Sequence, residues 1–257
     1  MMNRFPLFSL EGQVAVVTGG GRGIGRAIAE AMAAHGATVV LCGRTSQTLD
    51  SAVDAIRQAD GRATALQMDV TEEADVLRVR DRVLAELGRI DILVNNAGID
   101  PHYAAMEKTS TEAWNQIIEV NLTGVFNCCR LLGESMIAQR AGTIINVSSI
   151  AGHIGLKRQV PYCASKGGVE QLTKSLAYDW ADHGIRVNAI AYGFVGTDLT
   201  AEMASHPHIG PRLISRIPLG RFGTTDEVAG AAIFLASPAA SYVTGHSLLV
   251  DGGWTAT

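Results

Sequence analysis

Short apolar segments alternate with longer amphipathic segments along the whole chain. Continuous apolar runs are typical of strands buried on both faces of a sheet, and amphipathic segments between them are typical of covering helices. The alternation therefore predicts an α/β fold in one domain over residues 1–257, with a doubly wound parallel sheet of about seven strands. We expect strands near 13–18, 37–42, 62–67, 90–94, 142–147, 185–190 and 247–250, and helices near 24–35, 46–59, 72–87, 111–138, 162–182 and 225–236.

The first junction between strand and helix carries a glycine cluster, from Gly19 to Gly25. Glycines permit a tight turn and a close backbone approach, and the N–H groups at a helix N-terminus bind phosphates. The spacing Thr-Gly-x-x-x-Gly-x-Gly differs from the commonest dinucleotide fingerprint. Taken alone, this loop is also consistent with a flexible turn.

Tyr162 and Lys166 lie four residues apart in a predicted helix, so their side chains share one face. A free phenol, with a pKa near ~10, is a poor base at neutral pH. A neighbouring ammonium favours the phenolate, and so does the helix dipole if Pro161 marks the helix start. We therefore expect a lowered pKa for Tyr162. The pattern is also frequent by chance and carries weight only beside other motifs.

Two other predicted strands end in polar side chains. Ser149 follows the strand near 142–147, and Asn95-Asn96-Ala97-Gly98 follows the strand near 90–94. Ligands of open α/β sheets bind at the carboxyl ends of the strands. These residues are therefore expected at one rim of the sheet, together with the glycine loop.

In this order, the motifs resemble the short-chain dehydrogenases/reductases. The resemblance runs from Thr18-Gly19 to Val250-Asp251-Gly252-Gly253 and includes Asn121. It implies a Rossmann-type domain, hydride transfer between a nicotinamide cofactor and a CH–OH carbon, and a homotetramer that pairs the helices near 111–138 and 162–182.

The resemblance also implies residue roles. Tyr162 exchanges a proton with the substrate oxygen, Ser149 orients that oxygen, and Lys166 lowers the Tyr162 pKa and holds the ribose. Asn121 positions a water in the proton relay, although an amide bonded to backbone is an alternative. Asp69 contacts adenine, although it is also placed to cap a helix. The cofactor residues expected are Gly19, Arg22, Gly23, Ile24, Arg44, Asp69, Val70, Asn95, Ala97, Gly98, Tyr162, Lys166, Tyr192, Gly193, Val195 and Thr197.

Two positions depart from the family pattern. Tyr192 replaces a proline that would fix a φ angle beside the nicotinamide, which leaves the cofactor pose open. At the end of the second strand, where NAD-dependent members place a carboxylate, this chain has Gly43 followed by Arg44. Together with Arg22, Arg44 predicts a preference for NADP(H). A solvated Arg44 and use of NAD(H) as well is the alternative.

The substrate is less clearly encoded. Residues 8–12, 112–114 and 242–246 most resemble gluconate 5-dehydrogenase-like members, which suggests a sugar acid such as gluconate or 5-ketogluconate. His153, Lys157 or Arg158 would supply the cation, although a solvated loop also explains them. The alternatives are a 3-oxoacyl thioester on acyl carrier protein and, from another class, a cofactor-binding regulator without turnover. We expect residues 193–218 to form a lid over the substrate.

Charge and hydropathy argue against other classes. The net charge of −4 offers no footprint for nucleic acid, and no apolar run approaches the length of a membrane span. The four cysteines and seven histidines show no spacing typical of a metal site or a disulfide framework. We therefore expect a cytoplasmic protein with reduced cysteines, a small-molecule substrate and no metal.

Overall fold

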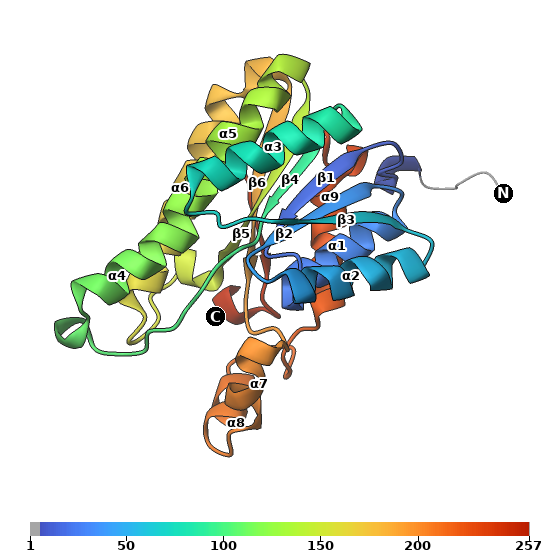
Figure 1. Ribbon diagram of the computed structural model, residues 1–257. Helices are drawn as coiled ribbons and strands as arrows, with labels where there is room; N and C mark the ends of the chain where they lie inside the picture. The colour runs from blue at the N-terminus through green and yellow to red at the C-terminus, as the bar shows by residue number, and fades with distance from the viewer. Residues whose placement is uncertain (1–5, 257) are drawn as a thin grey trace.

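The central sheet of the computed structural model has seven parallel strands in the order β3-β2-β1-β4-β5-β6-β7 (Figure 1). The structure describes residues 6–256, apart from the side chains of Pro6, Asp198, Leu199 and Glu202. The predicted fold class and all seven predicted strands are confirmed. The order reverses between β1 and β4, which is where such sheets bind dinucleotides. The strands are β1 (Val14–Thr18), β2 (Thr38–Gly43), β3 (Arg62–Gln67), β4 (Ile92–Asn95), β5 (Gly142–Ser149), β6 (Ile185–Tyr192) and β7 (Ser247–Val250).

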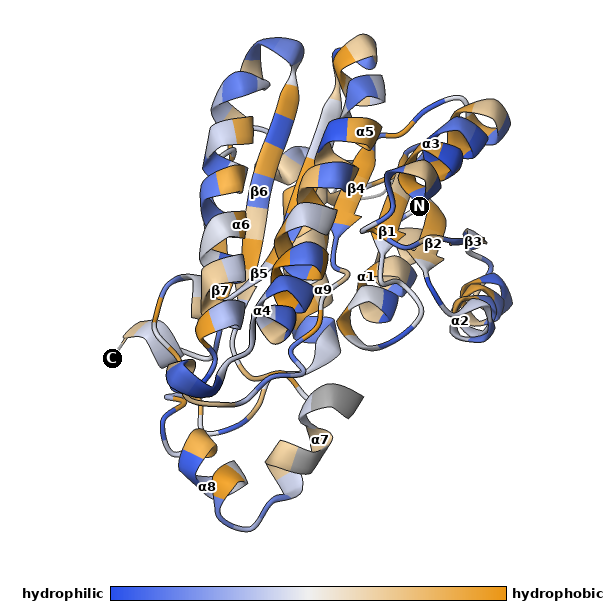
Figure 2. Ribbon diagram, turned by 60° about the vertical axis from the view of Figure 1, so that its left-hand side comes forward, coloured by the Kyte–Doolittle hydropathy of each residue, from blue (hydrophilic) through white to orange (hydrophobic). Residues whose placement is uncertain are grey.

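Helices cover both faces of this sheet. Helices α1, α2 and α9 bury their apolar sides against one face, and α3, α5 and α6 against the other (Figures 1 and 2). Alternate strand residues divide between the two cores: Ala15 and Val17 enter the first, and Val14 and Val16 the second. The helices are α1 (Gly23–Ala34), α2 (Ser46–Gln58), α3 (Glu73–Leu87), α4 (Thr111–Ile118), α5 (Gly124–Gln139), α6 (Val160–Asp179), α7 (Asp198–Ser205), α8 (Ile209–Ile214) and α9 (Thr225–Ala236).

The helix expected over 111–138 is interrupted. A π-helical turn, Glu119–Thr123, separates α4 from α5. Such turns insert a residue into a helix and often occur at functional sites. Here the turn carries Asn121, which is completely buried.

The segment expected as a lid contains α7 and α8, two short helices that the sequence did not predict. They project beyond the carboxyl edge of the sheet and stand apart from the helical layers (Figures 1 and 2). Most of their described residues are exposed. Among the residues that the structure describes, no helix is long and apolar enough to cross a membrane.

Candidate active site

The glycine loop leaves the start of α1 open to a ligand. Arg22 is the N-cap residue of α1 but makes no side-chain cap hydrogen bond. Gly19 has φ +65°, and a Cβ on Gly25 would lie 2.3 Å from the Gly19 carbonyl oxygen. Only glycine fits this packing, and the free N–H groups of the first turn suit a pyrophosphate. Gly23 and Ile24 are the first two residues of α1.

Two residues that were not predicted as site residues hold the loop. The Asn96 side-chain amide donates to the carbonyl oxygens of Thr18 and Gly19, at 3.0 and 3.2 Å. In return, the Thr18 hydroxyl accepts from the backbone N–H groups of Asn96 and Ala97, both at 3.0 Å. The end of β1 is thereby fastened to the end of β4. Both residues could have been predicted from the sequence, because Thr18 directly precedes the glycine cluster and Asn96 belongs to the Asn95-Asn96-Ala97-Gly98 motif.

Asn95 differs from its neighbours in the same motif. Its side chain is 2 % exposed and donates to Asn146 at 2.9 Å, within the core. The Asn95 side chain therefore points between strands and not over the rim, and the role expected for Asn95 in cofactor binding stays a prediction. Gly98 does reach the site: a Cβ added there would lie 3.7 Å from the Lys166 Nζ.

Past the end of β2, a cation stands beside a carboxylate. The Arg44 side chain is 70 % exposed, and its Nη1 lies 4.0 Å from Asp69 Oδ2. The other oxygen of Asp69 accepts from the Thr71 N–H at 3.0 Å, so Asp69 fixes a turn and does not cap α3, whose N-cap is Glu72. Val70 is buried beneath this turn. Arg44 and Asp69 thus lie next to each other past the end of β2.

Tyr162, Lys166 and Ser149 come together at the carboxyl end of β5. Helix α6 begins at Val160 with Pro161 in its first turn, as predicted. The Tyr162 and Ser149 hydroxyls are hydrogen-bonded, which by itself lowers the pKa of Tyr162. The Lys166 Nζ lies 5.7 Å from the centre of the Tyr162 ring. The three residues thus form one cluster.

The expected lowering of the Tyr162 pKa is wrong. Burial raises the pKa of Tyr162 to about 12, and this effect outweighs the Ser149 hydrogen bond, while the negative charge of Asp100 raises it further. Lys166 does not offset this burial. Its Nζ donates to the Val147 carbonyl at 2.8 Å, and its own burial lowers its pKa to about 8. Desolvation disfavours both charged forms, a cost that spacing along a helix does not reveal.

Asn121 uses its side chain to clamp the backbone of Ile99. Its Oδ1 accepts from the Ile99 N–H, and its Nδ2 donates to the Ile99 carbonyl, both at 2.8 Å. Of the two readings of the sequence, the amide bonded to backbone is therefore the one found for this side chain. The π-helical turn aims the amide at the loop after β4.

The segment after β6 closes the other side of the rim. Tyr192 pairs with Ser149 in the sheet register and is buried, and its hydroxyl has no partner among the described residues. Gly193 is required by packing, because a Cβ there would lie 2.8 Å from the Asp251 Cα. Val195 is buried, and Thr197 begins α7 with a methyl group 3.8 Å from where a Gly23 Cβ would lie. The start of the expected lid therefore meets the glycine loop.

Comparison with known proteins assigns this arrangement to a family. The family model described as enoyl-(acyl carrier protein) reductase matches residues 19–255. The chain belongs to the short-chain dehydrogenase/reductase family. It is an NAD(P)-dependent oxidoreductase that acts on CH–OH groups.

Relatives within the short-chain dehydrogenase/reductase family differ in substrate. The chain is 43% identical to a galactitol 2-dehydrogenase (L-tagatose-forming) of Cereibacter sphaeroides, over 97% of each chain. It is 42% identical to a 3-oxoacyl-acyl-carrier-protein reductase of Thermotoga maritima, over 95% of this chain and 98% of the relative. A gluconate 5-dehydrogenase from Burkholderia cenocepacia, solved in complex with NADP and tartrate, superposes with a TM-score of 0.95 at 39% identity, covering 98% of this chain and 99% of that one.

Of the basic residues suggested as substrate ligands of this dehydrogenase/reductase, His153 contacts a carboxylate, and the other two are exposed. His153 Nε2 is 3.2 Å from the buried Glu170 carboxylate and 3.0 Å from the Ser247 hydroxyl. Lys157 and Arg158 are exposed. The charged side chain that does lie near Tyr162 and Lys166 is Asp100, which was not predicted. The sequence feature that could have indicated Asp100 is its position, two residues after Gly98 of the motif that follows β4.

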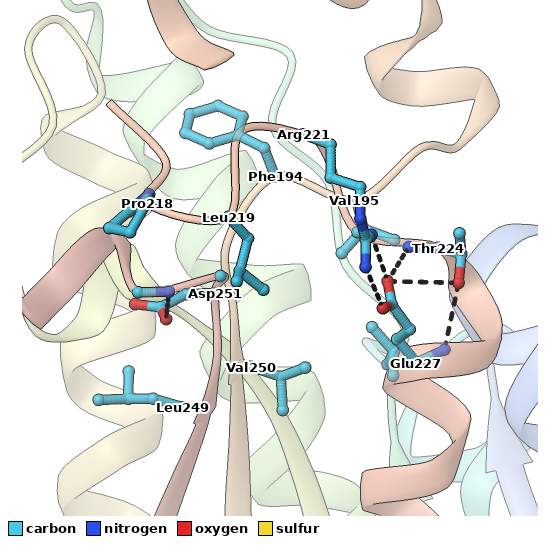
Figure 3. Close-up of a pocket in the computed structure, with 14 residues that line it drawn as sticks. Phe194, Val195, Pro218, Leu219, Arg221, Thr224, Glu227, Leu249, Val250 and Asp251 are labelled. Atoms are coloured by element: carbon cyan, nitrogen blue, oxygen red, sulfur yellow. Dashed lines mark hydrogen bonds and ion pairs between the residues drawn. The ribbon is translucent and has the colours of Figure 1, made fainter. Parts of the chain in front are cut away.

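A pocket of about 420 Å³ lies beside β7 at the base of α7 and α8 (Figure 3). Of the cofactor residues predicted, it includes Val195, and it includes none of the cluster at Tyr162. Its charged side chains are engaged within the protein: the Arg221 guanidinium holds the pKa of Glu227 at about 2, Glu227 also caps α9 with Thr224, and the Asp251 carboxylate accepts from Thr255. The charged residues that line this pocket therefore serve to stabilise the local structure. Among the described residues, no group of three or more His, Cys, Asp or Glu side chains is arranged to hold a metal ion.

Proposed function

We propose that this enzyme transfers a hydride between NADP(H) and a secondary alcohol or ketone of a small polyhydroxylated compound of the sugar class. The observation that carries the proposal is the meeting of Ser149, Tyr162 and Lys166 at the end of β5, on the rim that also holds the uncapped start of α1. The relatives named for galactitol and for gluconate support the substrate class. Within that class, the candidates are the sugar acid expected from the sequence and a neutral sugar alcohol.

The chain's own residues divide the chemistry between them. The bound nicotinamide supplies the hydride acceptor, or the donor in the reverse direction. Tyr162 exchanges a proton with the substrate oxygen, and Ser149 orients that oxygen by a hydrogen bond. Because burial keeps Tyr162 protonated, its hydroxyl is poised to donate a proton to a carbonyl oxygen. Lys166 holds the ribose hydroxyls, and Asn121 fixes the loop that frames the site.

NADP(H) is proposed over NAD(H) because β2 ends without a carboxylate. Gly43 has no side chain to accept ribose hydroxyls or to repel a 2′-phosphate, and Arg44 follows it. Arg22 and Arg44 are both exposed at the adenosine end of the rim. Guanidinium groups bind phosphate through charge-assisted, partly bidentate hydrogen bonds. Structures of relatives that hold NADP support the same choice.

A 3-oxoacyl thioester on acyl carrier protein is the second candidate substrate. It is favoured by the identity to the Thermotoga maritima reductase, which spans 95% of this chain. The two candidates differ in what the substrate entrance must admit, since an acyl chain is apolar and a sugar chain is hydroxylated.

The deciding experiment is a turnover assay that covers both substrate classes and both cofactors. The panel contains alditols, aldonic acids, their keto forms and acetoacetyl thioesters, each with NADP(H) and NAD(H). We expect turnover of hydroxylated compounds with NADP(H). Turnover of the thioester alone would favour the second candidate. Stoichiometric cofactor binding without turnover of any compound would favour a regulatory protein.

We also propose that the enzyme is a cytoplasmic homotetramer and that residues 193–218 cover the bound substrate. Phe126 on α5 and Tyr178 on α6 are 45% and 88% exposed, which suits helices that pair with a second copy. The four cysteines are unpaired, which suits a reducing compartment. Light scattering that gives a stable monomer mass at micromolar concentration would contradict the assembly.

A further inference from the structure

Asp100 is held rigidly beside the reacting groups. It directly follows Ile99, whose backbone N–H and carbonyl are both bonded to the buried Asn121 amide at 2.8 Å. The loop after β4 is therefore fixed one residue before Asp100. With the backbone fixed, only rotation of the Asp100 side chain is needed to bring its buried Oδ1 to a ligand, and such preorganisation favours selective recognition.

Gln159 fixes the Asp100 carboxylate from the opposite side of the site. It is the N-cap residue of α6, three positions before Tyr162, and its Nε2 donates to Asp100 Oδ2. The bond joins the loop after β4 to the helix that carries Tyr162 and Lys166. One carboxylate oxygen is thereby occupied and its orientation defined.

The second oxygen has no partner. Asp100 Oδ1 is buried and accepts no hydrogen bond from any residue that the structure describes. A buried carboxylate oxygen without a donor is costly, so it needs one from a ligand or from water. Burial raises the pKa of Asp100, in keeping with a carboxylate that has lost water without gaining enough donors.

The negative charge of Asp100 affects the pKa values of Tyr162 and Lys166. Its negative charge acts to raise the pKa of Tyr162 and opposes the lowering of the Lys166 pKa by burial, so it lies within interaction distance of both groups. A Cβ added at Gly98, two residues before Asp100, would lie 3.7 Å from the Lys166 Nζ, so Asp100 lies beside the site that a substrate of Tyr162 must enter. No residue that the structure describes donates a hydrogen bond to its free oxygen, although the nearby charges of His102 and Lys166 act to lower the pKa of Asp100.

We propose that Asp100, oriented by Gln159, accepts a hydrogen bond from a substrate hydroxyl and thereby selects neutral sugar alcohols and ketoses over sugar acids. This inference rests on the proposed function and narrows its substrate class. A hydroxyl supplies the donor that Oδ1 lacks. A carboxylate in the same place supplies no donor and sets two like charges together in a partly buried site.

The test uses pairs of compounds that differ only at one carbon. D-glucitol and D-gluconate share their remaining hydroxyls, as do galactitol and galactonate. With NADP+, we expect kcat/KM for the neutral member to exceed that for the acid by about tenfold or more, the effect of one charge-assisted hydrogen bond. Asp100→Asn, which keeps the shape and removes the charge, should bring the ratio toward one, chiefly through KM.

Asp54→Asn serves as the matched control, because Asp54 is exposed on α2 and its substitution removes the same charge far from the site. It should leave the ratio unchanged. A wild-type preference for the acid, or a ratio that Asp100→Asn does not alter, overturns the proposal.

Binding without turnover separates this proposal from the proposed function. Titration of the enzyme–NADPH complex with D-glucitol and D-gluconate, followed by NADPH fluorescence, forms dead-end complexes in which no hydride can move. We expect tighter binding of glucitol in wild type and a reduced difference in Asp100→Asn. Equal binding of the pair, or no binding of glucitol, sinks the role of Asp100. Absence of turnover together with selective glucitol binding counts against the proposed reaction and leaves this site standing.

Discussion

The two ends of the carboxyl rim of the sheet carry different kinds of functional group. Above β1 and β2, the candidate ligands are backbone N–H groups and the exposed guanidiniums of Arg22 and Arg44. Above β5, they are the buried side chains of Ser149 and Lys166, with the Tyr162 phenol between them. An exposed cation binds a phosphate without first being desolvated, whereas a group that must move a proton gains from a site that displaces its pKa. Binding and chemistry are thus separated along one edge of the sheet.

Tyr162→Phe should abolish proton transfer at the end of β5 and leave cofactor binding above β1 and β2 intact. Loss of proton transfer should lower kcat by about 10²–10⁴-fold, while the dissociation constant for NADPH stays close to that of wild type. Steady-state kinetics and fluorescence titration measure the two quantities. A variant that keeps a tenth of the wild-type kcat, or that loses NADPH binding, would remove the separation between the two ends.

Arg44→Ala should damage only the adenosine end. Loss of one charge-assisted hydrogen bond to the 2′-phosphate should lower kcat/KM for NADP(H) by about 10–100-fold. The kcat/KM for NAD(H), which has no 2′-phosphate, should stay unchanged. Arg82→Ala, which removes an exposed guanidinium on α3, is the matched control. A wild-type preference for NAD(H) would refute the assignment.

Gly43→Asp sharpens the same comparison. A Cβ at Gly43 would meet nothing closer than Leu49 Cδ2 at 3.5 Å, so the fold should accept the side chain. The new carboxylate should accept the ribose hydroxyls and repel a 2′-phosphate, which shifts the preference toward NAD(H) by about tenfold. Unchanged cofactor preference in a folded variant would show that the end of β2 does not face the ribose.

Gly25→Ala tests whether the glycine loop is a rigid support. The added Cβ would lie 2.3 Å from the Gly19 carbonyl oxygen, so we expect the free energy of unfolding to fall by about 1–3 kcal/mol. Gly230→Ala, at an exposed position of α9 with open space around it, should instead be neutral or stabilising by about 0.5–1 kcal/mol. Urea denaturation of both variants checks the contrast, and equal stabilities would contradict it.

The smallest effect that we expect concerns the ionisation of Tyr162, which should not change near neutral pH. Because burial raises the pKa of Tyr162 to about 12, the cofactor-free enzyme should show no phenolate from this residue between about pH 7 and 10. The folded state binds this proton more tightly than the unfolded state, so the linked stability should fall as the pH rises from about 10 toward 12. The difference in ultraviolet absorbance between wild type and Tyr162→Phe reports the ionisation. A step near neutral pH would restore the lowered pKa expected from the sequence.

The sequence predicted the parts of the fold that depend on local pattern. Apolar runs located all seven strands, and Pro161 located the start of α6. The glycine spacing predicted a loop in which a Cβ on Gly25 has no room. What it did not reveal is how side chains distant in sequence meet, such as Asn121 with Ile99, Asn95 with Asn146, or Gln159 with Asp100.

By itself, then, the sequence determined the seven strands and most of the covering helices, and it placed Tyr162 and Lys166 on one helical face, because periodicity and i, i+4 spacing are local properties of the backbone. The tertiary structure alone decided the charge state of that pair. Burial removes the water that would stabilise a phenolate and an ammonium, and Val147, not Tyr162, receives the Lys166 hydrogen bond. Desolvation is set by everything packed around a group, and spacing along the chain carries no record of it.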